Sequence, residues 1–365
     1  MKLLHFVQRF VWKIFPTFAI NKRVDTYIKN KYHDKIWGGY KLDEQIEENI
    51  HIFLTEKELE DKKFLESIKR DIVKSYLLYG VNANEYFTHN FYRKKHKERN
   101  RYMSKKRKDE LLIRTVGEKW EEAFLTLKDK NKFYQMAKDF FLRNVVSVEN
   151  KSDLNEFLHF AGKNPKFITK PSRNSCGQGI KIVDLSVNPP TQVFDDMLKE
   201  GTYICEELIS QDSRLALFNE SSVNTIRVPS IWDGTKACIF YPVLRTGRKG
   251  NVVDNAGSGG IFALVDADTG MVISDGYDEL GHHFVEHPDS YITYKGFQIP
   301  EWDNLKSVVN KIHSTMPKEF KYVGWDFTLS NKGWCVIEAN WGDFIMQQKT
   351  LDRGLYKEFK QILLK

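Results

Sequence analysis

The stretch Gly324-Trp325-Asp326-Phe327-Thr328-Leu329, with Trp334-Cys335-Val336-Ile337-Glu338-Ala339-Asn340 just after it, decides the fold of this chain. Two apolar runs on either side of Asn331-Lys332-Gly333 predict a hairpin of two antiparallel strands. Glu338 and Asn340 are two residues apart, so their side chains point to one face, which Asp326 shares in a suitable register. Two carboxylates and an amide oxygen suit Mg²⁺ that nucleotide phosphates also hold. A surface hairpin with three solvated polar residues is the alternative.

A second motif lies upstream, in Phe167-Ile168-Thr169-Lys170 and the loop from Ser172 to Gly179. A strand ends in a lysine, a small-residue loop follows, and a second strand begins at about Ile180. Gly177 and Gly179 allow the backbone to approach a ligand closely, and successive N–H groups can then hold phosphate oxygens beside Lys170. No helix follows the loop, which excludes a Walker A loop and a dinucleotide fingerprint. A plain hairpin is the alternative.

Two arginines could bind an anion in a cleft. If Ile226-Arg227-Val228 is a strand with its apolar residues buried, Arg227 projects to the opposite face, where its guanidinium can clamp a phosphate or an acyl-phosphate. Arg245 offers a second charge, shortly before a loop with three glycines that can close over a substrate. Ordinary surface ion pairs are the alternative for both.

A predicted strand runs into acidic residues in the stretch Tyr203-Ile204-Cys205-Glu206-Glu207-Leu208-Ile209. This stretch has two interpretations. Its backbone can pair with an adenine edge while a carboxylate takes ribose hydroxyls. Alternatively, it is an acidic strand end in solvent.

Composition limits the classes of protein that fit. The chain has 365 residues, 41% of them hydrophobic, and a net charge of +7. No apolar run approaches the roughly 20 residues that span a bilayer, and no signal peptide fits. Cys176, Cys205, Cys238 and Cys335 stand far apart, as free thiols do in a reducing compartment. We therefore expect a cytoplasmic protein.

Two charged segments leave their partners open. The basic segment 93–108 fits an anionic partner or a solvated helix face, but it has no aromatic stacking motif, which argues against nucleic acid. Residues 1–15 place apolar residues at helical spacing among Lys2, Arg9 and Lys13. This segment fits peripheral contact with the inner face of the membrane, or docking on the protein's own core or on a partner subunit.

The pattern of the chain predicts three regions in an α+β protein. Residues 1–125 read as mainly helical, with helices expected over Glu44–Glu60, Lys62–Tyr79 and Lys105–Lys128. Short strands separated by Gly, Asn and Asp follow, and they favour antiparallel sheets with helices to one side. We place the other two regions at 126–205 and 206–365.

Taken in order, these motifs resemble the ATP-grasp superfamily over roughly residues 126 to 350. The elements are Asp129-Lys130 opening a helix, Lys170 with its glycine loop, the Glu206–Ile209 hinge, Arg227 and the metal hairpin. Asn224-Thr225-Ile226-Arg227, Asp254-Asn255, His287-Pro288-Asp289 and Ile299-Pro300-Glu301-Trp302 more particularly resemble the sugar-transfer-associated ATP-grasp proteins, which are related to α-L-glutamate ligases. The resemblance implies an ATP-grasp fold, two α+β subdomains gripping ATP, with a mainly helical N-terminal region.

The resemblance also implies a role for each matching residue. The ATP-binding set would be Lys130, Lys170, Ser172, Ser175, Gly177, Gln178 and Gly179 around the phosphates, with Glu206, Glu207, Leu208 and Asp212 around adenine and ribose. Asp326, Glu338 and Asn340 would hold two Mg²⁺ ions, with Mn²⁺ as the alternative metal. Arg227, Arg245 and Asn255 would be the catalytic residues.

The implied reaction is an ADP-forming ligation of a carboxylate to an amine through an acyl-phosphate, in surface polysaccharide synthesis beside glycosyltransferases. An ATP-grasp kinase that phosphorylates a hydroxyl and a non-catalytic scaffold for glycosyltransferases are the alternatives. Two departures leave the acceptor open. The N-terminal region lacks a Rossmann-like pattern, and Trp341-Gly342-Asp343-Phe344 lacks the usual Pro-Gly or Ser-Gly turn.

Overall fold

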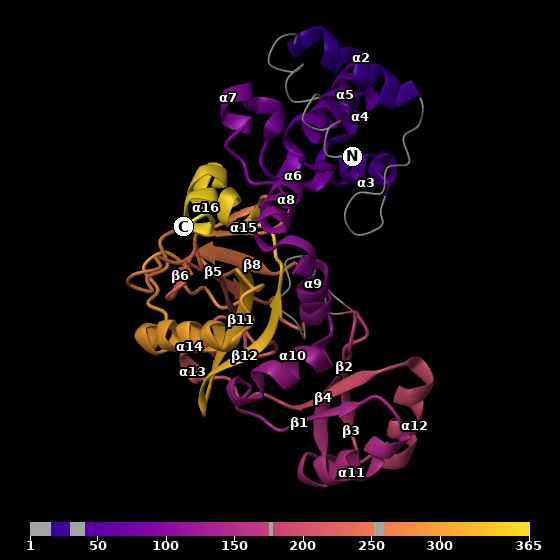
Figure 1. Ribbon diagram of the computed structural model, residues 1–365, viewed down its shortest axis with the longest axis vertical. Helices are drawn as coiled ribbons and strands as arrows, with labels where there is room; N and C mark the ends of the chain where they lie inside the picture. The colour runs from indigo at the N-terminus through magenta and orange to yellow at the C-terminus, as the bar shows by residue number, and fades with distance from the viewer. Residues whose placement is uncertain (1–15, 30–40, 175–177, 252–253, 255–258) are drawn as a thin grey trace. The chain divides into compact units, whose positions relative to one another are not determined.

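The computed structural model describes residues 16–29, 41–174, 178–251, 254 and 259–365 (Figure 1). The chain forms two compact units. One consists of the residues up to Glu110 with Asp343–Lys357, and the other of Leu111–Gly342 with Glu358–Lys365. These bounds differ from the expected regions 1–125, 126–205 and 206–365, which stay a prediction.

The first unit is helical. Its apolar core joins Ile20 and Val24 of one helix to Ile50, Ile72 and Phe87 of three others. Two of the expected helices are shorter than the pattern suggests. A capping box at Thr55 starts a new helix inside Glu44–Glu60, and Gly117, with φ of 79°, interrupts Lys105–Lys128. The elements here are α2 (Pro16–Lys29), α3 (Leu42–Phe53), α4 (Glu56–Glu60), α5 (Lys62–Tyr79), α6 (Ala83–Thr88), η1 (Phe91–Arg93), α7 (His96–Arg99), the start of α8 (Lys105–Val116) and α15 (Ile345–Leu351).

A four-stranded antiparallel sheet begins the second unit. Its strands run in the order β1-β4-β2-β3, and α11 and α12 pack on one face through Phe157, Phe167 and Phe194. The alternation of side chains puts Lys170 and Glu206 on the opposite face. The bounds are β1 (Val145–Val148), η4 (Lys151–Asp153), α11 (Leu154–Lys163), β2 (Lys166–Pro171), β3 (Lys181–Asp184), α12 (Pro190–Glu200) and β4 (Tyr203–Glu207).

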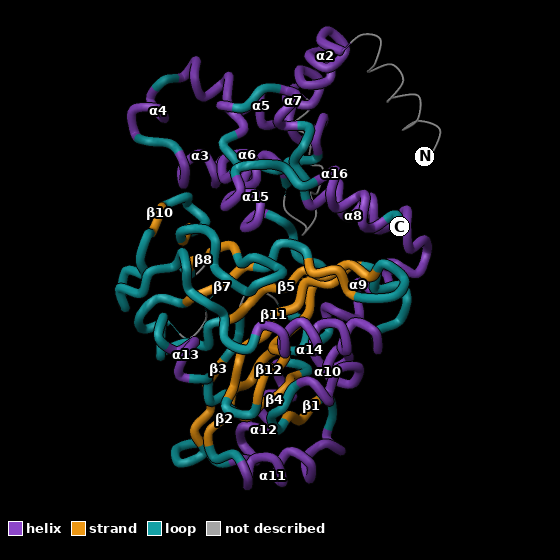
Figure 2. Tube along the Cα trace, turned by 90° about the vertical axis from the view of Figure 1, so that its left-hand side faces the viewer, coloured by secondary structure: helices purple, strands orange, loops and turns teal. Residues whose placement is uncertain are grey.

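A larger, eight-stranded antiparallel sheet follows in the order β10-β9-β8-β7-β5-β11-β12, with β6 paired to β5. Figure 2 shows β5, β11 and β12 side by side in this sheet. Its strands are β5 (Thr225–Trp232), β6 (Ala237–Ile239), β7 (Val243–Thr246), β8 (Ile261–Leu264), β9 (Gly276–Tyr277), β10 (His283–Phe284), β11 (Tyr322–Ser330) and β12 (Gly333–Asn340). The remaining helices are η2 (Gly117–Lys119), α9 (Trp120–Lys128), α10 (Lys130–Ala137), η3 (Lys138–Phe140), α13 (Ser213–Ala216), α14 (Trp302–Thr315) and α16 (Tyr356–Leu363).

A buried polar chain fixes α14 on the large sheet. Trp325 on β11 donates its indole N–H to Ser230 on β5 at 2.7 Å, and Ser230 contacts Nδ1 of His313 at 2.8 Å. His313 Nε2 in turn lies 2.7 Å from the Phe320 carbonyl oxygen. A helix and two strands are therefore fixed to one another through directional bonds as well as apolar packing.

Within the described ranges, the helices are too short or too polar to cross a bilayer. Residues 1–15, for which membrane contact and docking on the protein's own core or a partner subunit were the alternatives, lie outside these ranges, as does Cys176. Cys205, Cys238 and Cys335 are free thiols.

Candidate active site

The hairpin is formed by β11 and β12, and its register is the one the motif requires. Asp326 pairs with Glu338, and Gly324 pairs with Asn340, so the three polar side chains share one face. Asp326 is only 2% exposed. A methyl group at Gly324 would lie 3.1 Å from Oδ1 of Asn340, which shows that the amide lies over this glycine. This site is built into the sheet, and the surface-hairpin alternative does not apply.

Asp326 and Glu338 repel one another. Burial raises the pKa of Glu338, and the negative charge of Asp326 raises it further. Burial alone would also raise the pKa of Asp326, but Arg227 and Arg245 hold that pKa below its ordinary value. These shifts favour a negative charge on Asp326 over one on Glu338. A divalent cation held by both carboxylates would offset their repulsion.

Two arginines converge on Asp326 from the neighbouring strands. Arg227 stands opposite Asp326 on β5 and donates through Nε to one carboxylate oxygen and through Nη2 to the other, the latter at 2.8 Å. Arg245 on β7 donates from Nη1 to the same carboxylate at 3.1 Å. Both guanidinium groups are largely buried. The alternative of surface ion pairs does not apply to these two arginines, because the sheet buries them with their carboxylate.

Asp254 extends this network beyond the predicted residues. It accepts from Arg245 Nη2 at 3.1 Å, and its second oxygen accepts from the backbone N–H and the hydroxyl of Thr225. Burial raises the pKa of Asp254, although Arg245 opposes that shift. Asp254 thereby fixes Arg245 against β5. Asn255, the third predicted catalytic residue, lies outside the described residues.

A second cluster of charge lies on the face of the small sheet opposite α11 and α12. Lys170 on β2 contacts Glu206 on β4 at 2.9 Å. Arg143 donates to the other oxygen of Glu206 from Nε at 2.8 Å and from Nη2 at 2.6 Å, and its Nη1 reaches the Val336 carbonyl of β12 at 2.8 Å. Burial would raise the pKa of Glu206, yet the two cations bring it down to about 2. The buried Glu206 side chain thus links the two sheets through Arg143, a role that the sequence did not predict.

The loop after β2 is joined to the start of α10. Asp129 caps this helix by accepting from the N–H groups of Asn131 and Lys132 at 3.2 and 3.3 Å, which places Lys130 at its first turn as expected. The Lys130 N–H donates to the Ser172 carbonyl at 2.8 Å, and its ammonium contacts the Asn174 carbonyl. Ser172 is itself buried.

Gly179 ends this loop in a conformation that suits glycine. Its φ is 76°, and a methyl group there would lie 2.8 Å from Cγ of Pro171. Gln178 beside it is exposed, and Ser175 and Gly177 lie outside the described residues.

The two clusters meet at Lys130. Burial lowers the pKa of Lys130, while Glu338 of the hairpin opposes this shift from one side and Glu206 from another. Lys170 lowers the pKa of Lys130 further, because two ammonium groups are close together. Two cations suited to phosphate oxygens are therefore near Glu338, one of the proposed metal ligands.

The hinge residues have other partners. Glu207 accepts from the Asn144 N–H at 2.9 Å and pairs with Lys332 of the hairpin turn at 3.0 Å. Asp212 caps α13 and pairs with Arg214 at 2.8 Å. Leu208 is 37% exposed. The structure ties both carboxylates into local contacts, and their predicted ribose contacts stay a prediction.

The turn beyond Asn340 contains Gly342, in the stretch that lacks the usual Pro-Gly or Ser-Gly turn. The Gly342 N–H donates to Asn340 Oδ1 at 2.7 Å, and its carbonyl accepts from the Tyr322 hydroxyl at 3.2 Å. A methyl group at Gly342 would lie 2.8 Å from Arg227 Nη1 and 2.7 Å from Asn340 Oδ1. Glycine at this position lets the chain pass directly over the arginine and the amide.

The donor set fits Mg²⁺, which prefers oxygen ligands and keeps several sites for water and phosphate. Asp326 and Glu338 supply carboxylate oxygens, and Asn340 supplies an amide oxygen. Across the described ranges, no group of three or more His, Cys, Asp or Glu side chains is arranged to hold a metal. The hairpin would therefore need Asn340 and the phosphates of a nucleotide to complete a metal site.

A comparison with models of protein families shows which family the chain belongs to. A family model described as sugar-transfer associated ATP-grasp matches residues 112–363. The chain belongs to this family. The α+β ATP-grasp fold expected from the motifs is thereby confirmed. No curated protein matches the chain.

Several solved structures also match this ATP-grasp chain. The ATP-grasp ligase PsnB complexed with minimal precursor has 10% identity and a TM-score of 0.42, with 68% of this chain and 63% of PsnB covered. D-alanine–D-alanine ligase from Bacillus anthracis has 14% identity and a TM-score of 0.38, with 66% of each chain covered. D-alanyl-alanine synthetase A from Vibrio cholerae has 12% identity and a TM-score of 0.39, with 66% of this chain and 65% of that chain covered. The family assignment rests on the family match alone.

Proposed function

We propose that the protein is an ATP- and Mg²⁺-dependent ligase that joins a carboxylate to an amine and releases ADP and phosphate. The observation that carries this proposal is the convergence of Arg227 and Arg245 on Asp326, directly across the hairpin from Glu338. Two fixed cations beside a carboxylate pair that we propose binds metal suit a reaction in which negative charge passes between oxygens.

ATP is held, in this proposal, by Lys130 and Lys170 at its phosphates and by the Ser172–Gly179 loop. The buried Glu206 keeps Lys170 in place at 2.9 Å. Asp326, Glu338 and Asn340 would hold Mg²⁺, which supplies charge neutralisation at the phosphate oxygens when bound.

The chemistry proceeds in two balanced steps. A carboxylate oxygen of the substrate attacks the γ-phosphorus, and the bond to the β–γ bridging oxygen breaks, giving an acyl-phosphate and ADP. The amine nitrogen then attacks the acyl carbon, phosphate leaves with the C–O electron pair, and the nitrogen loses a proton. Arg227 and Arg245 stabilise the charge on the transferred phosphoryl group and on the tetrahedral oxyanion.

The proposal also includes where the protein acts in the cell, and the description of its family supports this part. A sugar-transfer association favours surface polysaccharide synthesis beside glycosyltransferases, in the cytoplasm. Contact with the inner face of the membrane would come from residues 1–15, outside the described ranges.

Hydroxylamine provides the test. With ATP, Mg²⁺ and a panel of sugar acids and amino acids, the ligase should release ADP and form an acyl hydroxamate only with its own carboxylate substrate. Glu338→Gln should abolish both signals. ADP release with a phosphorylated hydroxyl product and no hydroxamate would replace the ligase with a kinase. Nucleotide binding without turnover would favour the scaffold.

A further inference from the structure

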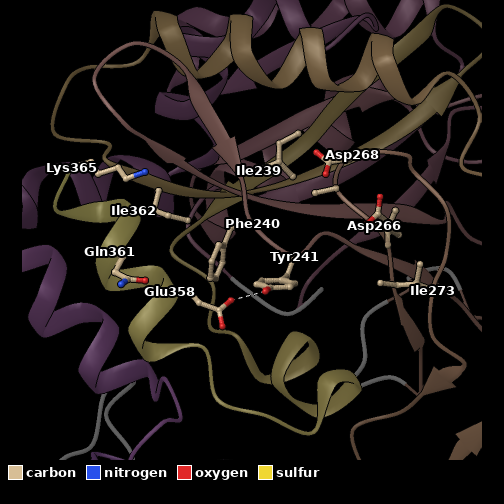
Figure 3. A pocket seen from close by; sticks show the side chains of 12 residues that line it. Ile239, Phe240, Tyr241, Asp266, Asp268, Ile273, Glu358, Gln361, Ile362 and Lys365 are labelled. Carbon is tan, nitrogen blue, oxygen red and sulfur yellow. Dashed lines mark hydrogen bonds between the residues drawn. The ribbon is translucent and has the colours of Figure 1, made fainter.

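A pocket in the second unit lies at the ends of β6 and β8, and it is separate from the candidate active site (Figure 3). Its lining comes from Ile239–Tyr241 at the end of β6, Val265–Asp268 after β8, Ile273 between β8 and β9, and one side of α16 with Lys365 beyond it. Its volume is about 710 Å³, within the range of small-molecule sites. None of its lining residues belongs to the predicted ATP, metal or catalytic set.

The floor of this pocket is apolar. Phe359 and Leu363 of α16 are buried in the core, whereas Ile362, on the adjacent side of the helix, is only partly buried and lines the pocket. Ile273, in the segment between β8 and β9, also lines the pocket and is 45% exposed. Figure 3 shows both side chains directed toward the pocket. Covering this surface with an apolar group would be favourable.

The polar residues of the pocket are mainly acidic. Asp266, Asp268 and Glu358 line it, against one lysine, Lys365. Two of the carboxylates are held in place. Glu358 accepts from the Tyr241 hydroxyl at 2.6 Å, and Asp266 accepts from the Thr269 N–H at 2.8 Å. Fixed negative charge around an apolar floor attracts a cation and repels a carboxylate or phosphate.

We propose that this pocket binds an organic cation that has an apolar body and a protonated amine. The apolar body covers Ile273 and Ile362, and the ammonium group lies toward Asp268 and Glu358. The inference rests on the volume of the pocket, its exposed apolar floor and its excess of carboxylates, and it is independent of the proposed ligase reaction.

Matched probes test this directly. Hexylamine, hexanol and hexanoate share an alkyl chain and differ in charge, and their binding to the full-length protein can be followed by methyl NMR of labelled isoleucines. Hexylamine should shift the methyl signals of Ile273 and Ile362 and bind about tenfold more tightly than hexanol, with hexanoate weakest. Equal affinity for the three probes, or shifts confined to isoleucines outside the pocket, would overturn the proposal.

Two substitutions and one control complete the experiment. Asp268→Asn removes an exposed charge, and Ile273→Lys places a cation at the wall, so each should weaken hexylamine binding about tenfold without unfolding the protein. Ile113→Lys is the control, because Ile113 is 41% exposed on α8 and does not line the pocket. Unchanged hexylamine affinity in both pocket variants would contradict the proposal, as would equal loss in the control.

Discussion

Arg227 holds Asp326 from the neighbouring strand, with its guanidinium joined to both carboxylate oxygens of its partner. The pair lies in the middle of the large sheet, where Arg245 adds a third hydrogen bond at 3.1 Å. Arg227 and Arg245 therefore hold the Asp326 carboxylate in position without a metal. In turn, Asp326 fixes the positions of the two guanidinium groups.

Removing Arg227 should destabilise the fold as well as the reaction. Arg227→Met leaves Asp326 buried with only Arg245 as a cation, so we expect the free energy of unfolding to fall by about 3 kcal/mol. Urea denaturation measures this change. Arg214→Met is the matched control, since Arg214 pairs with Asp212 and Glu301 at the surface and should change stability little. An equal loss of unfolding free energy in the two variants would show that burial of the Arg227–Asp326 pair does not matter for stability.

Glu338→Gln should have opposite effects on stability and on turnover. In the absence of metal, the substitution removes a carboxylate whose charge is disfavoured by burial and by Asp326, so the melting temperature in EDTA should rise. ADP release should fall by about 100-fold or more, because a metal ligand is lost. A melting temperature that falls in EDTA would contradict the like-charge account of the pair.

Gly342→Ala tests the close passage of the chain over Arg227. The added methyl group would meet Arg227 Nη1 and Asn340 Oδ1, so we expect ADP release to fall about 10- to 100-fold through displacement of these groups. Gly162→Ala is the control, because nothing lies within 4 Å of its added methyl group in α11. Wild-type turnover in Gly342→Ala would show that the arginine and the amide tolerate displacement.

His313 should make stability depend on pH. Burial lowers its pKa from 6.5 to about 4, so the unfolded chain takes up this proton first as the pH falls. His313 therefore costs the folded state stability as the pH falls from 6.5 to about 4, by about 3 kcal/mol in total. Urea denaturation across this range should show a steeper loss in the wild type than in His313→Gln. Parallel curves would contradict a neutral, buried imidazole.

The hairpin could be predicted from the sequence because its signals are local. The turn Asn331-Lys332-Gly333 and the two-residue spacing of Glu338 and Asn340 set the strands and the shared face. The helix start at Asp129-Lys130 was expected from the family resemblance, and the structure has it there.

The partners of these residues could not be predicted, because they depend on which strands pair. Arg227 meets Asp326 across 99 positions of the chain, and Arg143 reaches Glu206 across 63. Arg143 stands in no motif, and Asp254 was readable only as part of a loop signature. The return of Asp343–Lys357 to the first unit follows from packing, which no local pattern indicates.

The most direct test of the central claim, that Asp326, Glu338 and Asn340 hold a divalent metal with ATP, is electron paramagnetic resonance of Mn²⁺. The free-ion signal is titrated with protein in the presence of a non-hydrolysable ATP analogue. The wild type should take up Mn²⁺, and joint replacement of Glu338 by Gln and Asn340 by Ala should weaken that binding about 10- to 100-fold. Wild-type Mn²⁺ affinity in the double variant would contradict the claim.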